Sequence, residues 1–299
     1  MTALGKTECL VPRSHPPTLL TLARRCLREE CALERGQRVL VAVSGGPDSM
    51  ALLHVLSRLG ATFGIELVAH GVDHGLRAEA ASELDLAERF AKTLDVPFAR
   101  TRLRVPPGGN LQARAREQRY AALREAAAAA GATVIATAHH ADDRAETFLI
   151  RLLRGASPGA LAVLPARDGD SMRPLIRARR ADVLAHLTRH EVPYAEDPSN
   201  RDHRFVRVRV REEILPLLES LSPRIVEHLN GLADELGDVS PLSLEVPDGS
   251  RVHLGRVQRA ALRRLLAGDS PRGRIRLRGG WEIRLDPLTG ALRIAPVET

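Results

Sequence analysis

Cysteines, aromatic residues and long apolar runs are scarce in this sequence. Its three cysteines, Cys9, Cys26 and Cys31, match neither a metal knuckle nor a CxxC pair, so we expect inert thiols in a reducing compartment. Aromatic residues make up only 3% of the chain, which argues against a surface that stacks several splayed bases. No apolar run approaches the roughly 18 residues that span a bilayer, and the first residues lack a signal-peptide pattern. We therefore expect a soluble, cytoplasmic protein with no membrane segment.

Lysine is nearly absent as well, although the chain is basic. Only Lys6 and Lys92 are lysines, and the other 42 of the 44 basic residues are arginines. The formal net charge is +7 and the pI is about 10.2. We attribute the choice of arginine over lysine to codon bias in a GC-rich genome, but this bias does not explain the net positive sum. That sum suits a polyanionic partner.

Strand-like and helix-like segments alternate over the first half of the chain. Alternation of this kind implies an α/β fold around a mostly parallel, buried sheet. Ligands of such folds bind at the carboxyl ends of the strands, and polar clusters follow Val43, Ala69 and Ala138. The predicted strands are 38–43, 65–69, 97–103 and 133–138, and the predicted helices are 18–35, 50–59, 78–94, 112–130 and 141–154.

The pattern changes after about residue 175. Helices are predicted at 179–190, 205–218 and 224–236 without intervening strands, followed by strands at 242–246, 274–277, 281–285 and 292–295 and a helix at 257–266. We predict a domain at 18–222, helical from about residue 179, and a small α+β C-terminal module at 223–299. Between residues 251 and 284 stand ten arginines and only two acidic residues. This asymmetry favours contact with a nucleic acid, and a solvated basic surface is the alternative.

The segment Ser44-Gly45-Gly46-Pro47-Asp48-Ser49 lies between the first predicted strand and the next helix. The two glycines let the backbone approach an anion, and amides at the helix N-terminus point toward it. The two serines add hydroxyl donors, whereas the carboxylate of Asp48 suits Mg²⁺. Because the chain has no GxxxxGKS or GxxxxGKT, this is not a Walker loop. Two glycines alone would indicate an ordinary strand-to-helix turn, but all six residues in this context favour phosphate binding.

Further motifs follow in order, and the most specific is His139-His140-Ala141-Asp142-Asp143-Arg144-Ala145-Glu146-Thr147. The other motifs are 72–77, 110–120, 151–155, 173–175 and 196–200, the last followed by Arg204-Phe205. Together with the glycine loop, they resemble, block by block over about residues 38–216, the tRNA(Ile)-lysidine synthase family of N-type PP-loop ATP pyrophosphatases. The resemblance implies a Rossmann-like PP-loop domain (adenine nucleotide alpha hydrolase-like), a helical connector and a small C-terminal domain. It also implies ATP as co-substrate, with Mg²⁺ held by Asp48.

The activity implied by this resemblance is the ligation of free L-lysine to C2 of a wobble cytidine. The cytidine lies in the CAU anticodon of an isoleucine tRNA, and the reaction passes through an adenylated base with release of pyrophosphate and AMP. Codon reading would change from AUG to AUA, and identity from Met to Ile. The alternatives are another PP-loop adenylating enzyme, such as a tRNA thiolase or the synthetase half of an amidotransferase, and a nucleotide-binding regulator without chemistry. The sequence leaves the oligomeric state open, with a homodimer among the options.

Two carboxylates of the most specific motif are candidates for binding the lysine ammonium. Asp143 and Glu146 are three residues apart, so on a helix they share a face that can hold an ammonium or help to deprotonate it. The alternative is an acidic first turn that favours the helix dipole. For His139 we favour a hydrogen bond to the nucleotide phosphates, and for Arg119 a clamp on pyrophosphate or AMP. The role of His140 stays open.

The segment 205–211 alternates apolar residues with arginines, which is typical of a strand. The family resemblance instead implies a helix with arginines that contact lysine and tRNA. The sequence departs from the family at Val208 and Glu212, where Asn and His are usual. It also departs at Gly71, where many relatives carry a side chain that faces the nucleotide. The arginines concerned are Arg207, Arg209 and Arg211.

Overall fold

The structure, a computed structural model, divides into two compact units. The first comprises residues 1–142 and 166–200, and the second comprises residues 143–165 and 201–299. Within the described part of the chain, no helix has the length and apolar character needed to cross a membrane. The described residues are 17–73, 75, 80–103, 111–195, 206–238, 242–247, 251–254, 258, 261–262, 265, 274–277, 280–286 and 291–297.

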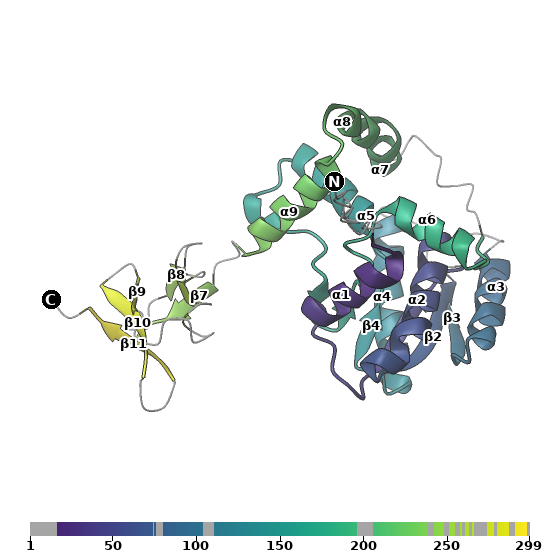
Figure 1. The fold of residues 1–299 in the computed structure, drawn as a ribbon, viewed down its shortest axis with the longest axis horizontal. Helices are drawn as coiled ribbons and strands as arrows, with labels where there is room; N and C mark the ends of the chain where they lie inside the picture. Colours follow the sequence, from purple (N-terminus) through teal and green to yellow (C-terminus); the bar gives the residue numbers. More distant parts are fainter. Residues whose placement is uncertain are drawn as a thin grey trace, which may run out of the picture. The chain divides into compact units, whose positions relative to one another are not determined.

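A six-stranded sheet forms the centre of the first unit, in the order β3-β2-β1-β4-β6-β5 (Figure 1). Neighbouring strands are parallel from β3 to β6, and β5 runs antiparallel to β6. The predicted α/β fold with a mostly parallel sheet is therefore confirmed. The strands are β1 (Arg38–Val43), β2 (Glu66–Asp73), β3 (Phe98–Arg102), β4 (Val134–Ala136), β5 (Arg167–Asp168) and β6 (Ser171–Met172).

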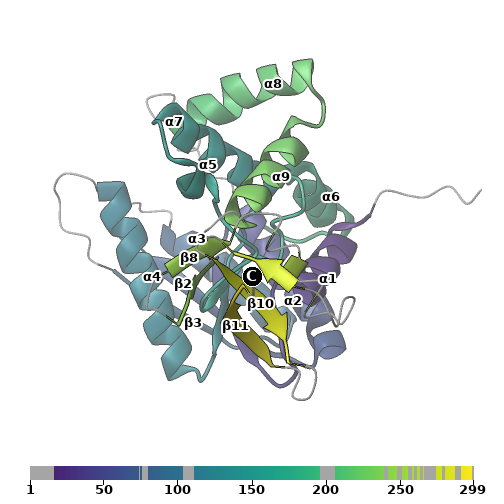
Figure 2. The same cartoon turned by 90° about the vertical axis from the view of Figure 1, so that its left-hand side faces the viewer.

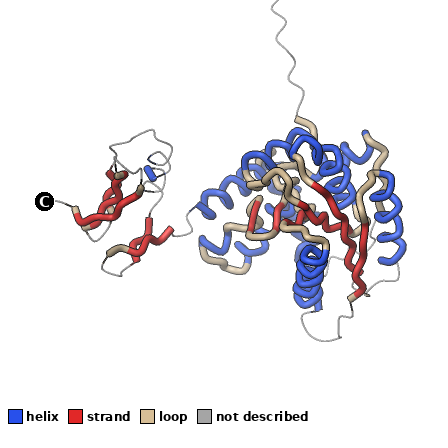
Figure 3. Tube along the Cα trace, turned by 90° about the horizontal axis from the view of Figure 1, so that it is seen from below, coloured by secondary structure: helices blue, strands red, loops and turns tan. Residues whose placement is uncertain are grey.

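Helices cover both faces of this sheet (Figure 3). On one face, Leu123 of α4 packs against Leu40 and Ile135 of neighbouring strands. Val39 and Val41 point to the opposite face, because successive strand residues alternate, and both are fully buried. The helices of this unit are α1 (Leu19–Glu29), α2 (Pro47–Phe63), α3 (Ala80–Thr93), α4 (Leu111–Ala129) and α6 (Arg180–Arg189).

The strand order places a topological switch point beside β1. From β1 the chain builds β2 and β3 on one side, and then returns through α4 to form β4 on the other side. Val41 of β1 pairs with Ala136 of β4, so the loops that follow these two strands leave neighbouring carboxyl ends of the sheet. Such a switch point is where open α/β sheets bind their ligands.

The second unit begins within α5 (Ala141–Leu153). Phe148 of α5 packs with Leu161, Val163 and Ala233 in one apolar core. Ala233 belongs to α9, which therefore packs against α5, whereas our predicted boundary at residue 223 assigns it to the C-terminal module. That boundary stays a prediction. The other helical elements here are η1 (Pro158–Leu161), α7 (Val206–Arg209), η3 (Val210–Ile214), α8 (Leu215–Leu221) and α9 (Ile225–Asp238).

From Val206 onward, the alternating segment is helical, so its strand-like interpretation is wrong and the helix implied by the resemblance is confirmed. Figure 2 shows α7 and α8 following one another along the chain. The element between them, η3, is a π-helical turn, in which the amide of Leu215 donates to the carbonyl of Val210, five residues back. Pro216, the next residue, has no N–H to donate. Such wide turns are frequent at functional sites.

Two small antiparallel sheets lie near the C-terminus, with strand orders β7-β8 and β11-β10-β9. Strand β8 was not predicted by our sequence analysis, and neither were the two-residue strands β5 and β6 of the central sheet. Four positions of the predicted helix at 257–266 are described, and all four are helical. Val252, Leu265 and Ile283 contribute to a single shared core. The strands are β7 (Leu242–Glu245), β8 (Arg251–Leu254), β9 (Arg274–Arg276), β10 (Trp281–Leu285) and β11 (Leu292–Pro296).

Candidate functional site

The loop between β1 and α2 depends on a glycine at position 45. Gly45 has a φ of +84°, and a Cβ atom there would lie 2.5 Å from the carbonyl oxygen of Glu83 on α3. Glycine is therefore required both by the backbone conformation and by the close approach of α3. Helix α2 begins at Pro47, and its N-cap, Gly46, makes no side-chain capping bond. The first amides of α2 are thus suited to bind an anion.

Two serines tie the two ends of this loop together. Ser49 Oγ accepts a hydrogen bond from the amide of Ser44 at 3.1 Å and donates to the carbonyl of Gly46 at 3.0 Å. The two hydroxyl oxygens lie 3.2 Å apart. Ser44 is exposed, whereas Ser49 is buried. Ser49 thus shapes the loop from inside, and Ser44 is placed to donate to a ligand.

A distant segment also contacts this loop. The amide of Ala195 donates to the carbonyl of Gly45 at 2.9 Å. Ala195 directly precedes the predicted motif at 196–200, which lies outside the described residues together with Arg204-Phe205. His74, residues 76–77 and Asn110 from the other predicted motifs also lie outside them.

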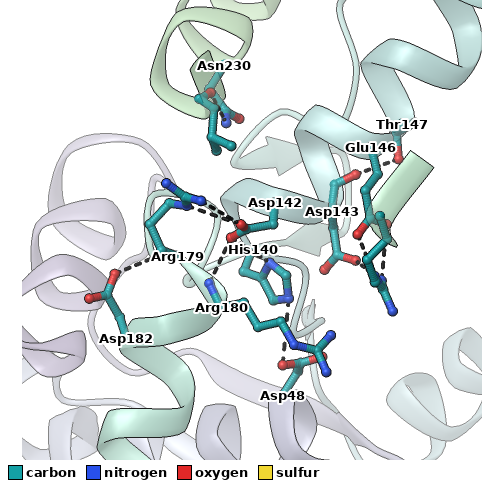
Figure 4. Close-up of polar contacts among 12 residues, drawn as sticks. Asp48, His140, Asp142, Asp143, Glu146, Thr147, Arg179, Arg180, Asp182 and Asn230 are labelled. Atoms are coloured by element: carbon teal, nitrogen blue, oxygen red, sulfur yellow. Dashed lines mark hydrogen bonds and ion pairs between the residues drawn. The ribbon is translucent and has the colours of Figure 1, made fainter. Parts of the chain in front are cut away.

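His140, whose role the sequence leaves open, lies between two carboxylates (Figure 4). The ring is buried, with Nε2 3.7 Å from Asp48 Oδ1 and Nδ1 3.5 Å from Asp142 Oδ2. Asp142 also accepts hydrogen bonds from Arg179 Nη2 at 3.0 Å and from the amide of Arg180 at 2.7 Å. Burial raises the pKa of Asp142, but the hydrogen bonds from His140 and Arg179 outweigh it and bring the pKa below its usual range. His140 thus stands beside the ionised carboxylate of Asp142, and its other ring nitrogen lies 3.7 Å from Asp48.

The sequence analysis did not single out Arg179, which pairs with Asp142 in this arrangement. One local signal was present. Asp182 stands three residues after Arg179, and its Oδ2 accepts the Arg179 amide at 2.8 Å, which marks the start of α6. A helix start at residue 179 fixes the neighbouring backbone, but it does not reveal which carboxylate the guanidinium reaches.

His139 and Arg119 lie in the same unit as the glycine loop. His139 Nδ1 is 3.0 Å from Thr137 Oγ1, in the segment that joins β4 to α5. The guanidinium carbon of Arg119 lies 5.5 Å from the centre of the Tyr120 ring, and burial lowers the pKa of this arginine. The phosphate contacts that we expect for His139 and Arg119 stay predictions.

Asp143 and Glu146 point from α5 in the same direction, as their spacing predicts (Figure 4). Glu146 pairs with Arg211 through both oxygens, at 2.6 and 3.1 Å, and with Arg207 Nε at 2.9 Å. Asp143 Oδ1 accepts from Arg207 Nη2 at 3.0 Å and lies 3.6 Å from Arg211 Nη2. The Glu146 side chain is only 1% exposed. We call these four residues the carboxylate–arginine cluster, and it shows that this face of α5 binds cationic groups.

Arg209, the third predicted substrate contact in this segment, points elsewhere. Its Nη2 pairs with Glu213 Oε2 at 3.1 Å, and its side chain is 61% exposed. Residues four apart on a helix are neighbours, whereas residues two apart are not, so Arg207 and Arg211 reach the same carboxylates and Arg209 does not. Its predicted contact with substrate stays a prediction.

The three positions that depart from the family pattern, Val208, Glu212 and Gly71, differ in burial and in their neighbours. Val208 is buried and Glu212 is exposed. At Gly71, a Cβ atom would lie 2.5 Å from Leu84 Cδ2 and 3.1 Å from Phe98 Cζ. The apolar side chains of α3 and β3 therefore fill the space that a larger residue at position 71 would need.

The two described cysteines are buried and unoxidised. Their sulfur atoms lie 3.7 Å apart, with Cys26 Sγ 3.7 Å from the carbonyl of Arg173 and Cys31 Sγ 3.7 Å from that of Ala166. Cys9 lies outside the described residues. Over the described ranges, no group of three or more His, Cys, Asp and Glu side chains is arranged to hold a metal ion.

Comparison with known proteins places these features in a family. A family model described as a PP-loop domain matches residues 20–218. The tRNA(Ile)-lysidine synthase of Symbiobacterium thermophilum is 40% identical over 240 residues, which are 76% of this chain and 49% of that protein. The enzyme of the same name from Bradyrhizobium diazoefficiens is 43% identical over 203 residues, 66% of this chain and 56% of that protein. The chain thus spans about half the length of these curated relatives.

A solved structure shares the fold. The U34-tRNA thiolase NcsA from Methanococcus maripaludis, with its 4Fe-4S cluster, matches with a TM-score of 0.60 at 18% identity. The match covers 72% of this chain and 78% of that one. At this identity, the likeness shows the fold alone. The match of the family model, the glycine loop after β1 and the switch-point topology agree, and the chain belongs to the PP-loop domain family.

Proposed function

We propose that this protein ligates free L-lysine to C2 of the wobble cytidine in the CAU anticodon of an isoleucine tRNA. The C2 oxygen attacks the α-phosphorus of ATP, and pyrophosphate leaves. The lysine amine then attacks C2, loses a proton, and AMP departs with the former C2 oxygen. The proposal agrees with the likeness to curated tRNA(Ile)-lysidine synthases at 40 and 43% identity.

The single observation that carries the proposal is the carboxylate–arginine cluster. An enzyme that uses a free diamino acid needs a place for a long, cationic side chain. Asp143 and Glu146 would form such a place, and the proposal is supported by their binding of guanidinium groups in the structure. A guanidinium and an ammonium are both hydrogen-bond donors with a full positive charge, so a carboxylate pair that binds one can bind the other.

The glycine loop would bind the phosphates of ATP. Gly45 and Gly46 let the backbone come close, and the N-terminus of α2 favours negative charge. The Asp48 carboxylate is 32% exposed and stands in the first turn of α2, where a hard cation would bring it together with phosphate oxygens. Mg²⁺ held there by Asp48 would neutralise the charge on the departing pyrophosphate.

The three-stranded sheet near the C-terminus would contact the tRNA backbone. Arg284 is opposite Arg274 on one neighbouring strand and opposite Arg293 on the other, so three arginines form a row across the sheet. The adjacent row, centred on Ile283, contributes to the apolar core on the opposite face. Glu282 already pairs with Arg284, and Asp286 already pairs with Arg293, so the like charges of the row are partly neutralised within the protein. Further anions would complete that neutralisation. Phosphodiester groups provide such anions without any sequence readout.

A tRNA thiolase is the main alternative activity on this fold. It would transfer sulfur where a lysidine synthase transfers an amine. Cys26 and Cys31 are five residues apart rather than in a CxxC pair, and both sulfur atoms are buried against backbone carbonyls. The arrangement of these two cysteines does not favour sulfur transfer. The cation site that we propose at Asp143 and Glu146 would have no role in a thiolase.

Pyrophosphate and AMP release would test the proposal directly. The full chain is supplied with ATP and Mg²⁺, and then with the CAU tRNA and L-lysine singly and together. We expect pyrophosphate release to require the tRNA, and AMP release with turnover to require lysine as well. The modified tRNA should gain the mass of one lysine less one water. Turnover that is independent of lysine would contradict the proposal, and so would a failure to modify the tRNA.

A further inference from the structure

The formal charges of the four residues in the carboxylate–arginine cluster balance. Asp143 and Glu146 carry two negative charges, and Arg207 and Arg211 carry two positive charges. With the Glu146 side chain only 1% exposed and that of Asp143 13% exposed, the charges would be costly to leave uncompensated. A lysine ammonium that approached this cluster would add a third positive charge to two carboxylates. It can bind well only if one guanidinium leaves.

The two arginines differ in how firmly they are held. Arg211 forms a two-point pair with Glu146 and has a side chain that is 27% exposed. Arg207 bridges the two carboxylates through Nε and Nη2, and its side chain is 43% exposed. Without Arg207, Arg211 would be the one guanidinium of the cluster facing both carboxylates, paired with Glu146 and 3.6 Å from Asp143. Among the residues of the cluster, the formal charge would then be minus one, which matches one ammonium.

We propose that Arg207 is an exchangeable counter-ion, which occupies the ammonium site until an anionic group of a substrate takes up its guanidinium. This inference rests on the proposed function, because it assumes that Asp143 and Glu146 bind the lysine side chain. Lysine binding is thereby coupled to anion binding, and the free enzyme has low affinity for the amino acid. The apparent affinity is reduced by the fraction of molecules in which the site is filled by Arg207.

The group that accepts Arg207 must be an oxyanion, since the guanidinium fork pairs with carboxylate and phosphate alike. Besides the phosphates of ATP, which we assign to the glycine loop, two sources are present among the substrates. One is a phosphodiester of the tRNA, and the other is the α-carboxylate of lysine itself. A phosphodiester would couple lysine binding to tRNA binding, whereas the α-carboxylate would make the exchange internal to one lysine molecule. Binding of 1,5-diaminopentane, which has the ammonium and no carboxylate, separates the two sources.

The test is equilibrium dialysis of radiolabelled L-lysine and 1,5-diaminopentane against the full chain, with and without the CAU tRNA. Arg207→Gln should raise the affinity of the free enzyme for the diamine about tenfold, which is the scale of one charge-assisted hydrogen bond. If the tRNA is the acceptor, lysine affinity also rises and its dependence on tRNA largely disappears. If the α-carboxylate is the acceptor, the affinity for the diamine rises and the affinity for lysine does not. Arg207→Lys keeps the charge and should retain most of the wild-type discrimination.

Arg224→Gln removes the same charge from an exposed position of the same unit and serves as the matched control. Unchanged or weaker diamine binding in Arg207→Gln would overturn the inference, because Arg207 would then be no competitor for the site. Failure of the proposed function looks different. In that case Asp143→Asn and Glu146→Gln would leave lysine binding unchanged in the presence of tRNA, whatever the Arg207 variants do.

Discussion

A Cβ atom on Gly45 would lie 2.5 Å from the carbonyl oxygen of Glu83, so the glycine loop approaches helix α3 most tightly at a residue without a side chain. Gly45→Ala should therefore destabilise the protein for two reasons. The left-handed conformation costs an L-residue roughly 1–2 kcal/mol, and the contact forces the loop or α3 to move. We expect a lower free energy of unfolding in urea and loss of tRNA-dependent pyrophosphate release.

Gly36→Ala separates these two effects. Gly36 has a similar φ of +82°, and a Cβ atom there would meet nothing within 4 Å. This variant should lose only the conformational part of the stability and should keep pyrophosphate release. Equal losses in both variants would show that the approach of Glu83 is unimportant.

Asp48→Asn should abolish Mg²⁺-dependent pyrophosphate release without unfolding the protein. The side chain is 32% exposed, and a neutral amide is a weak ligand for Mg²⁺. Release can be followed by an enzyme-coupled assay, with the thermal midpoint measured in parallel. Asp170→Asn, at a surface pair with Arg124, is the control for loss of an acidic residue. Near-normal turnover of Asp48→Asn would exclude the magnesium role.

Asp143→Asn and Glu146→Gln should raise the KM for lysine at least tenfold and change the KM for ATP far less. Each variant removes a charge-assisted hydrogen bond to the ammonium, and such bonds contribute on the order of 1.5–3 kcal/mol. Steady-state kinetics with either substrate varied would show the difference. Glu213→Gln breaks an exposed pair with Arg209 and should leave the lysine KM unchanged. Normal lysine dependence in both variants would favour the first-turn helix role instead.

Acid should destabilise the protein through a histidine pair. His54 Nδ1 lies 2.8 Å from His186 Nε2, and burial, together with the charge of His190, lowers the pKa of both rings to about 4. Arg58 lowers the pKa of His54 further. The unfolded chain, with a pKa near 6.5, binds more protons between pH 6.5 and 4, so the folded state loses stability as the pH falls through this window.

Urea unfolding at pH 7.5 and 5 tests this expectation. His54→Gln should reduce the acid-dependent loss of free energy by on the order of 1–2 kcal/mol. His228→Gln, at an exposed histidine of α9, should follow the wild type. The pair is not the source of acid sensitivity if His54→Gln retains the full pH dependence.

The arginine row on the C-terminal sheet should contribute affinity for tRNA and no chemistry. Arg274→Gln with Arg293→Gln should weaken tRNA binding and lower the slope of log affinity against log salt by up to about one unit per lost phosphate contact. Filter binding at several salt concentrations measures both quantities. Arg124→Gln, at a surface pair in the other unit, controls for net charge. An unchanged affinity and slope would mean that the row is only a solvated surface.

Much of the fold follows from local patterns. The apolar run 38–43 and the glycines after it define a strand, a loop and a helix within a few residues, and the structure has all three. The spacing of Asp143 and Glu146 likewise fixes a shared helix face before any tertiary contact is known. Such features depend on neighbours in sequence, and a sequence contains that information directly.

Features that depend on distant residues could not be predicted in this way. No residue close to Gly45 in the sequence indicates that the Ala195 amide donates to the Gly45 carbonyl. Likewise, no residue close to Asp142 in the sequence indicates that Asp142 pairs with Arg179. The alternation at 205–211 fits a strand as well as a helix, and the outcome reflects burial of Val208 and the joint pairing of two arginines with Glu146. Tertiary contacts override local preference in such segments.

The π-helical turn also fixes the number of residues in this segment of the chain. Arg207 pairs with Asp143, and Leu215 is buried. Because the turn between them is π-helical, the segment that joins these two residues is one residue longer than an α-helical turn would make it. Each residue of a helix advances it by about 100°. Deletion of a single residue such as Glu212 would relax the turn to an α-helix and swing either Arg207 or Leu215 away from its partners. Homologous chains that keep both contacts should therefore tolerate substitutions in this turn and exclude single-residue gaps.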